Sequence, residues 1–153
     1  MASRRKGRIL AFQALFCWES ARTTARESGH PLPTDALERL LEFSWLGEKA
    51  RTLDESIAAF ARLLIAGTAE NVAVIDKTIK AHLLNWDISR LNRVDLAIMR
   101  MSVYTLMFQK DLAPSIVIDE AIGISREFGT DDSFKFINGV LDGIRKTLEK
   151  ESG

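Results

Sequence analysis

Apolar residues recur at three- and four-residue intervals along most of the chain, which is the spacing of one face of an α-helix. The clearest stripe consists of Leu53, Ile57, Phe60 and Leu64. Alternation with a period of two residues, which marks a half-buried strand, is scarce. The pattern therefore predicts an all-α protein.

Six further segments show helical periodicity, and each predicts a helix with one inward apolar face. We expect about seven helices, and the short links after residue 50 favour antiparallel neighbours in a compact bundle. The expected inward residues are Ile9, Phe12 and Phe16; Leu37, Leu40 and Leu41; Val72, Ile75, Ile79 and Leu83; Val94, Ile98, Met101 and Phe108; Val117, Ala121, Ile124 and Phe128; and Ile137, Leu141, Ile144 and Leu148.

Turn-forming residues separate these segments. Residues 29–33, with the sequence GHPLP, predict a loop. Pro114 predicts a break, and Gly129 predicts a helix end. Helix starts are expected at residues whose short polar side chains can cap a helix: Thr34 or Asp35, Asp87 or Ser89, and Asp131, Asp132 or Ser133.

Length and composition favour one soluble domain spanning residues 1–153. The chain has 153 residues, of which 46% are apolar. No apolar run approaches the roughly 20 residues of a membrane span, and no secretory signal is recognisable. A single cysteine fits a reducing cytoplasm, and with two histidines it does not suffice for a zinc site. We expect no metal and no cofactor.

Charge is balanced overall but not locally. The chain carries 21 basic and 21 acidic residues. Four of the basic residues, Arg4, Arg5, Lys6 and Arg8, stand together near the start. Basic groups at a helix N-terminus oppose the helix dipole, which indicates a use such as phosphate binding. A frayed, solubilising arm is the equal alternative.

A second candidate cluster begins the last predicted helix, where Lys135 and Phe136 are adjacent. Phe136 is rotated away from the inward Ile137, at the edge of the core. An edge aromatic can stack on an unpaired base while lysine meets a phosphate. A wide apolar face that simply buries Phe134 and Phe136 is the alternative.

Signs of catalysis are weak. The sequence has no glycine-rich phosphate loop, no HExxH and no GxSxG motif. Cys17 lies on an apolar helix face, and His82 follows another apolar stripe; both positions favour packing. No carboxylate pair stands out as an acid–base couple. A binding protein is therefore favoured over an enzyme.

Three blocks of sequence resemble the NusB transcription antitermination factor family. Residues 4–16 contain RRKGR followed by AFQALF. Residues 86–104 begin with Trp86 and contain VDLAIMR. The most specific block, residues 114–142, ends in KFINGVLD. Together the blocks cover nearly the whole chain apart from residues 20–50.

The resemblance implies an all-helical fold of two small bundles and a role without catalytic turnover. It implies binding of boxA-like single-stranded RNA together with NusE, a small-subunit ribosomal protein. It also implies a place in an RNA polymerase elongation complex with other Nus factors, in support of ribosomal RNA transcription. Some members instead form homodimers. The chain has no room for the methyltransferase that follows such a domain in other proteins.

The resemblance also implies roles for individual residues. Asp95 and Tyr104 match positions where the family meets its protein partner. Gly7 stands where alanine is usual, which is expected to weaken its helix by about 1 kcal/mol. The positions that match the RNA surface are Arg4, Arg5, Lys6, Arg8, Gln13, Phe16, Asp132, Lys135 and Phe136.

A helical scaffold or homodimer that binds proteins and no specific RNA is the rival hypothesis. A small hydrolase or transferase is a third, and it requires a pocket with convergent titratable groups.

Overall fold

The computed structural model describes residues 2–84 and 87–152, within which every regular element is a helix. Seven of these described elements are α-helices and two are 3-10 helices, which confirms the predicted all-α class. Trp86, part of the second resembling block, lies outside the described residues. The chain divides into two units, one ending at Ala66 and the other beginning at Gly67.

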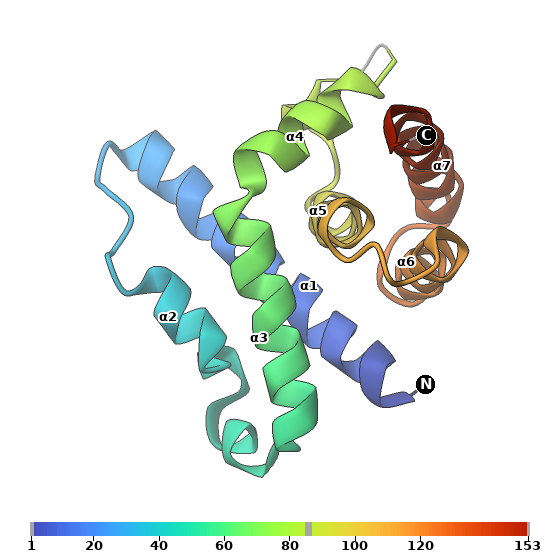
Figure 1. The fold of residues 1–153 in the computed structure, drawn as a ribbon. Coiled ribbons are helices and arrows are strands. Elements are labelled where there is room, and N and C mark those ends of the chain that lie inside the picture. Colours follow the sequence, from blue (N-terminus) through green and yellow to red (C-terminus); the bar gives the residue numbers. More distant parts are fainter. Residues whose placement is uncertain (1, 85–86, 153) are drawn as a thin grey trace. The chain divides into compact units, whose positions relative to one another are not determined.

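The first unit contains the long helix α1 (Ala2–Ser28), the short helix α2 (Ala36–Leu41), the 3-10 helix η1 (Ser44–Thr52) and most of α3 (Glu55–Glu70). Helices α1 and α2 pack side by side (Figure 1). The loop predicted at residues 29–33 separates them. Asp35 is the N-cap residue of α2, as expected, although its side chain makes no capping hydrogen bond.

The buried face of α1 differs from the predicted stripe. Of the three inward residues expected there, only Phe12 is buried, while Ile9 and Phe16 are half-buried. The buried stripe instead includes two alanines that periodicity of large residues does not reveal. Its members are Leu10, Ala11, Phe12, Ala14, Leu15 and Trp18.

The second unit contains α4 (Val72–Ala81), the 3-10 helix η2 (Ile88–Arg90), α5 (Arg93–Phe108), α6 (Pro114–Phe128) and α7 (Ser133–Ser152). Helices α5, α6 and α7 all pack on one another, and α4 packs on α5 and α7 (Figure 1). Every residue of α5 from Asp95 to Leu106 is buried. This unit therefore has a central helix surrounded by the others.

Two apolar predictions fail at helix ends in the second unit. Phe108 is 48% exposed and Phe128 is 37% exposed, although both continue an inward stripe. Each is the last residue of its helix, where the packed neighbours no longer cover the apolar face. The inward residues Ile137, Leu141 and Ile144 of α7 are buried as predicted.

Several predicted breaks and caps are confirmed. Pro114 is in the first turn of α6, where its missing N–H costs nothing, and Gly129 is the C-cap of that helix. The cap predicted at Asp87 or Ser89 for the helix of Val94 and Ile98 is wrong, because Asp87 instead caps the short 3-10 helix η2, accepting from the N–H of Ser89 at 3.0 Å. Asn92, which the helical pattern does not single out, caps α5 by accepting from the N–H of Val94 at 2.8 Å.

Two sets of polar contacts join α4 and its end to neighbouring helices. The Arg100 guanidinium of α5 donates to both carboxylate oxygens of Asp76, at 2.8 and 2.7 Å. His82, just after α4, lies with Nδ1 2.9 Å from the Thr78 carbonyl oxygen and Nε2 2.9 Å from Thr147 Oγ1 in α7. Both ring nitrogens of His82 are thus engaged within the fold, so this residue has the packing role that its apolar stripe predicts.

No single helix within the described residues is long and apolar enough to cross a bilayer; only α3 and α4 taken together, as a bent pair, meet that length and composition.

Candidate nucleic-acid interface

Arg4 and Arg8 lie one turn apart on α1 and share an aromatic neighbour. Their guanidinium carbons are 4.2 and 5.4 Å from the ring centroid of Phe60 in α3. These distances allow cation–π attraction, which helps to hold the two flexible arginine side chains in place. Arg4 and Arg8 of the predicted basic helix start thus both lie against the Phe60 ring. The hydrophobic periodicity predicts only a core role for Phe60.

Gly7 explains how α1 comes so close to Phe60. A Cβ atom at position 7 would lie 2.6 Å from Cδ2 of the Phe60 ring, closer than carbon atoms pack. Gly7 is buried, since the turn of α1 between Arg4 and Arg8 rests on this ring. The expected loss of helix propensity therefore accompanies a close approach that alanine would allow only if the Phe60 ring shifted.

The remaining predicted residues of α1 occupy a different face. Gln13 follows Lys6 by two helical turns and Phe16 follows Arg5 by three, so each pair shares a side of the helix. Lys6 is exposed, and the other three are half-buried. The six predicted residues of α1 hence form two strips, one seated on Phe60 and one facing away from the buried stripe.

An acidic residue lies near the basic helix start. Asp54, just before α3, accepts hydrogen bonds from the Ser56 hydroxyl and from the N–H groups of Ile57 and Ser56, which lower the pKa of its carboxyl. The Lys6 charge lowers that pKa further. Asp54 is fully exposed, so it is a screened neighbour of Lys6 and not a buried counter-ion.

In the second unit, the start of α7 gathers three of the predicted residues. Lys135 and Asp132 are exposed, and Phe136 is half-buried. Asp132 and Phe136 line a pocket of about 340 Å³, together with Asp95 from α5. The other lining residues come from η2, the start of α5 and the α6–α7 turn: Arg90, Leu91, Asn92, Thr130 and Ser133.

Asp95, predicted to meet a protein partner, is buried in this pocket wall with 7% of its surface exposed. Its carboxyl hydrogen-bonds the Ser133 side chain, but its Oδ1 atom has no hydrogen-bond partner among the described residues. Desolvation by burial raises the pKa of the carboxyl, and the Ser133 hydrogen bond offsets only part of that rise. The structure therefore groups Asp95 with Asp132 and Phe136.

Tyr104, the other predicted partner residue, is only 8% exposed. Its ring lies directly over Gly67, where a Cβ atom would collide with it, and 5.5 Å from the Phe108 ring centroid. This placement favours a packing role. The exposed group beside it is Phe108.

The two groups of predicted RNA-binding residues lie in different units. The α1 group belongs to the unit that ends at Ala66, and the α7 group belongs to the unit that begins at Gly67. Each group is well defined within its own unit. Their convergence on one RNA strand stays a prediction.

Comparison with known proteins agrees with these features. A family model described as the NusB family matches residues 5–146. The chain belongs to the NusB family. A transcription antitermination protein NusB from Treponema denticola is 49% identical over 142 residues, which cover 93% of this chain and 95% of the relative. Its counterpart in Treponema pallidum strain Nichols is 47% identical over 144 residues, covering 94% and 93%.

Solved NusB structures share the fold. A structure of T. maritima NusB is 36% identical, aligns over 94% of this chain and 90% of its own, and has a TM-score of 0.75. A structure of NusB and NusE in complex with double-stranded RNA is 24% identical with the same TM-score, covering 96% and 98%, and shows the fold alone. Membership in the NusB family confirms the prediction that this chain is not an enzyme.

One basic residue next to the α7 cluster, Arg126, is not predicted by the sequence pattern. The Arg126 guanidinium, near the end of α6, lies 4.4 Å from the ring centroid of Phe134, and Lys135 Nζ lies 5.9 Å from the same centroid. Arg126 and Phe134 are separated by the α6–α7 turn. No spacing rule within one helix connects them, which is why periodicity misses this pair.

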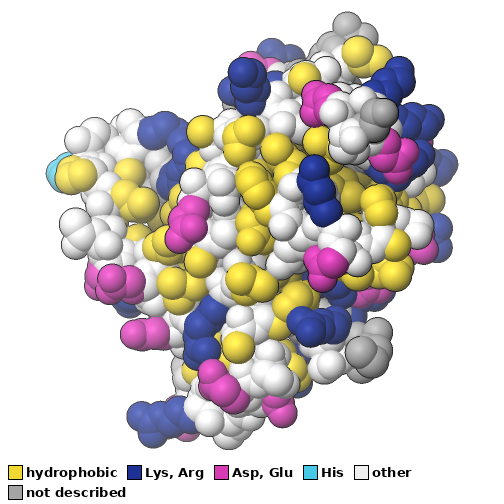
Figure 2. All heavy atoms as spheres, in the orientation of Figure 1, with side chains coloured by type: hydrophobic (Ala, Val, Ile, Leu, Met, Phe, Trp, Pro, Cys, Tyr) yellow, Lys and Arg dark blue, Asp and Glu magenta, His cyan; other side chains and the backbone are white. Residues whose placement is uncertain are grey.

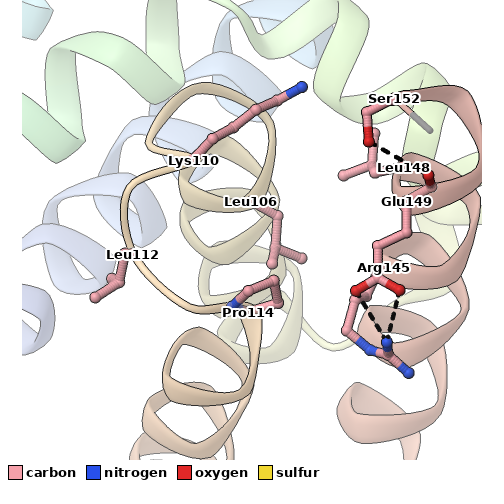
Figure 3. A pocket seen from close by; sticks show the side chains of 8 residues that line it. All are labelled: Leu106, Lys110, Leu112, Pro114, Arg145, Leu148, Glu149 and Ser152. Carbon is pink, nitrogen blue, oxygen red and sulfur yellow. Dashed lines mark hydrogen bonds and ion pairs between the residues drawn. The ribbon is translucent and has the colours of Figure 1, made fainter.

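A pocket of about 130 Å³ at the other end of α7 contains none of the predicted residues (Figure 3). Arg145, in its wall, donates to Asp142 at 2.8 Å and to Glu149 at 3.0 Å. These carboxylates raise the pKa of the Arg145 guanidinium. Because Arg145 is paired with these two acidic residues, it offers little to a phosphate.

The described residues give little support for a metal site or for a reactive cysteine. They contain no group of three or more His, Cys, Asp or Glu residues arranged to hold a metal ion. Burial raises the pKa of the Cys17 thiol, which disfavours the reactive thiolate. On the face shown in Figure 2, basic, acidic and apolar side chains are interspersed. This face therefore presents no continuous basic surface.

Proposed function

We propose that this protein is a transcription antitermination factor that binds boxA-like single-stranded RNA together with NusE. The observation that carries the proposal is the family match over residues 5–146, which includes the second candidate cluster and all of the first except Arg4. Relatives 47% and 49% identical are named as transcription antitermination proteins. By this proposal the protein acts in the cytoplasm, in an RNA polymerase elongation complex with other Nus factors, and supports ribosomal RNA transcription.

The two clusters supply complementary kinds of RNA contact. The cations Arg4, Arg5, Lys6 and Arg8 contribute affinity through phosphates. Phe136 and Phe16 can stack on unpaired bases, while Lys135 and Gln13 can reach phosphates or base edges. Asp132 lies at the edge of the second cluster, where its negative charge repels phosphates. NusE binding beside this surface would raise RNA affinity by adding contacts in one complex.

The NusE surface is proposed near Asp95 and Tyr104, the residues matched by the resemblance. Since Tyr104 is buried, the exposed Phe108 is the better candidate for direct contact on this side. A homodimer that uses the same surface instead of NusE is the rival.

A titration of boxA-like RNA with and without NusE tests the proposal. Fluorescence anisotropy should show saturable binding that unlabelled boxA-like RNA displaces and unrelated RNA does not, and NusE should strengthen it. Displacement by any RNA to the same degree, with NusE having no effect, would favour the scaffold or homodimer without specific RNA binding.

The basic helix start can be tested with a double substitution. Arg4→Ala with Arg8→Ala should weaken binding and reduce the slope of log affinity against log salt by about 1 to 2, roughly one for each phosphate that is no longer neutralised. The matched control is Arg22→Ala with Arg26→Ala, two arginines in the same spacing on α1 that pair with Glu19 at 3.2 Å. An equal slope change in both variants would mean that only net charge matters.

A further inference from the structure

Phe60 of α3 is a large aromatic residue that the core of the first unit does not fully enclose. The sequence pattern assigns it to one inward stripe with Leu64, yet Leu64 is 1% exposed whereas Phe60 is only half-buried. The guanidinium carbons of Arg4 and Arg8 lie over its ring, 4.2 and 5.4 Å from the centroid. The ring therefore already contacts two cations, unlike an aromatic residue that offers an open face to an RNA base.

The backbone of α1 is fitted closely to the same ring. Gly7 is buried, and a Cβ atom on it would lie 2.6 Å from Cδ2 and 3.4 Å from Cε2 of Phe60. Helix α1 thus meets the ring with a residue that has no side chain, between two arginines whose side chains lie over the ring. This arrangement holds the ring beside both guanidinium groups.

The contact with Phe60 prepares both arginines for binding phosphate. An arginine side chain has several rotatable bonds, so its immobilisation in a complex costs free energy. Arg4 and Arg8 are one helical turn apart and carry like charges, so they also repel each other. Attraction to the ring offsets this repulsion and restricts both side chains before RNA binds. It removes neither the charge nor the N–H donors with which a guanidinium binds phosphate.

We infer that Phe60 is a positioning residue of the RNA site, which holds Arg4 and Arg8 in the arrangement that binds phosphates without itself touching the RNA. This inference rests on the proposed RNA binding and extends it to a residue of α3, a helix that contains none of the predicted RNA-binding positions. Removal of the ring should therefore weaken RNA binding only through the two arginines.

A double-mutant cycle tests this inference. Anisotropy at low salt measures the affinity for boxA-like RNA of Phe60→Leu, which keeps an apolar side chain but removes the ring. We expect Phe60→Leu to weaken binding by about three- to tenfold when Arg4 and Arg8 are present. When both arginines are replaced by alanine, its effect should fall below about twofold. In the matched background with Arg22→Ala and Arg26→Ala, its full effect should remain.

A graded change of the ring separates attraction to the arginines from packing. Phe60→Tyr keeps the aromatic face and should bind RNA within about twofold of the wild type. Fluorinated phenylalanines at position 60 withdraw electron density from the ring with little change of shape, so affinity should fall with each added fluorine. Thermal unfolding verifies that each variant is folded, and the fluorinated series decides the question if Phe60→Leu does not fold.

The outcomes separate this inference from the proposed function. Absence of any boxA-like RNA binding by the wild type would overturn both. Wild-type binding that Phe60→Leu and the fluorinated residues leave unchanged would overturn the inference alone. An equal loss with and without Arg4 and Arg8 would also overturn it, because the ring would then act through packing or touch the RNA itself. Stronger binding by Phe60→Leu would equally overturn it, since the ring would then withhold the arginines from RNA.

Discussion

At the residue scale, several charged groups lie at positions where an apolar residue would pack equally well. Asp95 is a buried carboxyl group, and Arg4 and Arg8 both lie against the ring of Phe60. A desolvated carboxyl group reduces the stability of the fold, and such groups are found more often at functional sites than elsewhere.

The pH dependence of stability tests the environment of Asp95. Because burial raises its pKa above the ordinary 3.8, there is a pH range above 3.8 in which the folded chain still holds a proton that the unfolded chain has released. Stability is therefore lost as pH rises from the ordinary pKa to the raised folded pKa, and the loss persists above it. Asp95→Asn removes this titration. Urea unfolding should show the variant gaining stability relative to the wild type as the pH rises from about 3 through the raised pKa of the folded state, and no further gain above it. A difference that does not change with pH would contradict a desolvated carboxyl.

Asp132 gives a second prediction at this scale. It is exposed at the start of α7, three residues before Lys135. If RNA phosphates pass Lys135, the Asp132 charge repels them, and Asp132→Asn should strengthen RNA binding by about two- to fivefold at low salt. Asp111→Asn, which removes an exposed acid in the α5–α6 loop, is the control. Weaker or equal binding by Asp132→Asn would place the RNA elsewhere.

At the element scale, small residues determine how closely the helices approach. Periodicity predicts the α7 face well, because large residues mark it, and it finds the Gly129 and Pro114 boundaries. It fails for α1, where Ala11 and Ala14 belong to the buried stripe, and for α5, which is buried on all sides and has no outward face to contrast. Contacts across a turn, such as Arg126 on Phe134, depend on tertiary packing that no local pattern encodes.

Two glycine substitutions test the close approach of α1 to α3. Gly139→Ala places a Cβ in open space on α7 and should stabilise the protein by about 0.5–1 kcal/mol through helix propensity. Gly7→Ala gains the same propensity but meets the Phe60 ring, so it should be less favourable than Gly139→Ala by about 1 kcal/mol or more. Chemical denaturation of both variants measures the difference. Equal stabilisation would show that Phe60 moves aside freely.

At the scale of the whole molecule, the sequence is sufficient to identify the family, whereas the local geometry of each cluster requires the structure. The resemblance identifies the family and names both clusters, and the structure shows how each is built within its own unit. The pocket beside Phe136, the burial of Asp95 and the shared ring under Arg4 and Arg8 require coordinates, because they join residues distant in sequence. The central claim is that one RNA strand contacts both clusters at once.

Photo-crosslinking tests that claim most directly. A single boxA-like RNA carrying photoreactive uridines at both ends is bound at one-to-one stoichiometry, irradiated and digested, and the crosslinked peptides are identified by mass spectrometry. We expect individual RNA molecules crosslinked both to the start of α1, around Arg4–Arg8, and to the start of α7, around Lys135 and Phe136. Crosslinks confined to one of these segments, or a complex that requires two RNA molecules to reach both, would contradict the account.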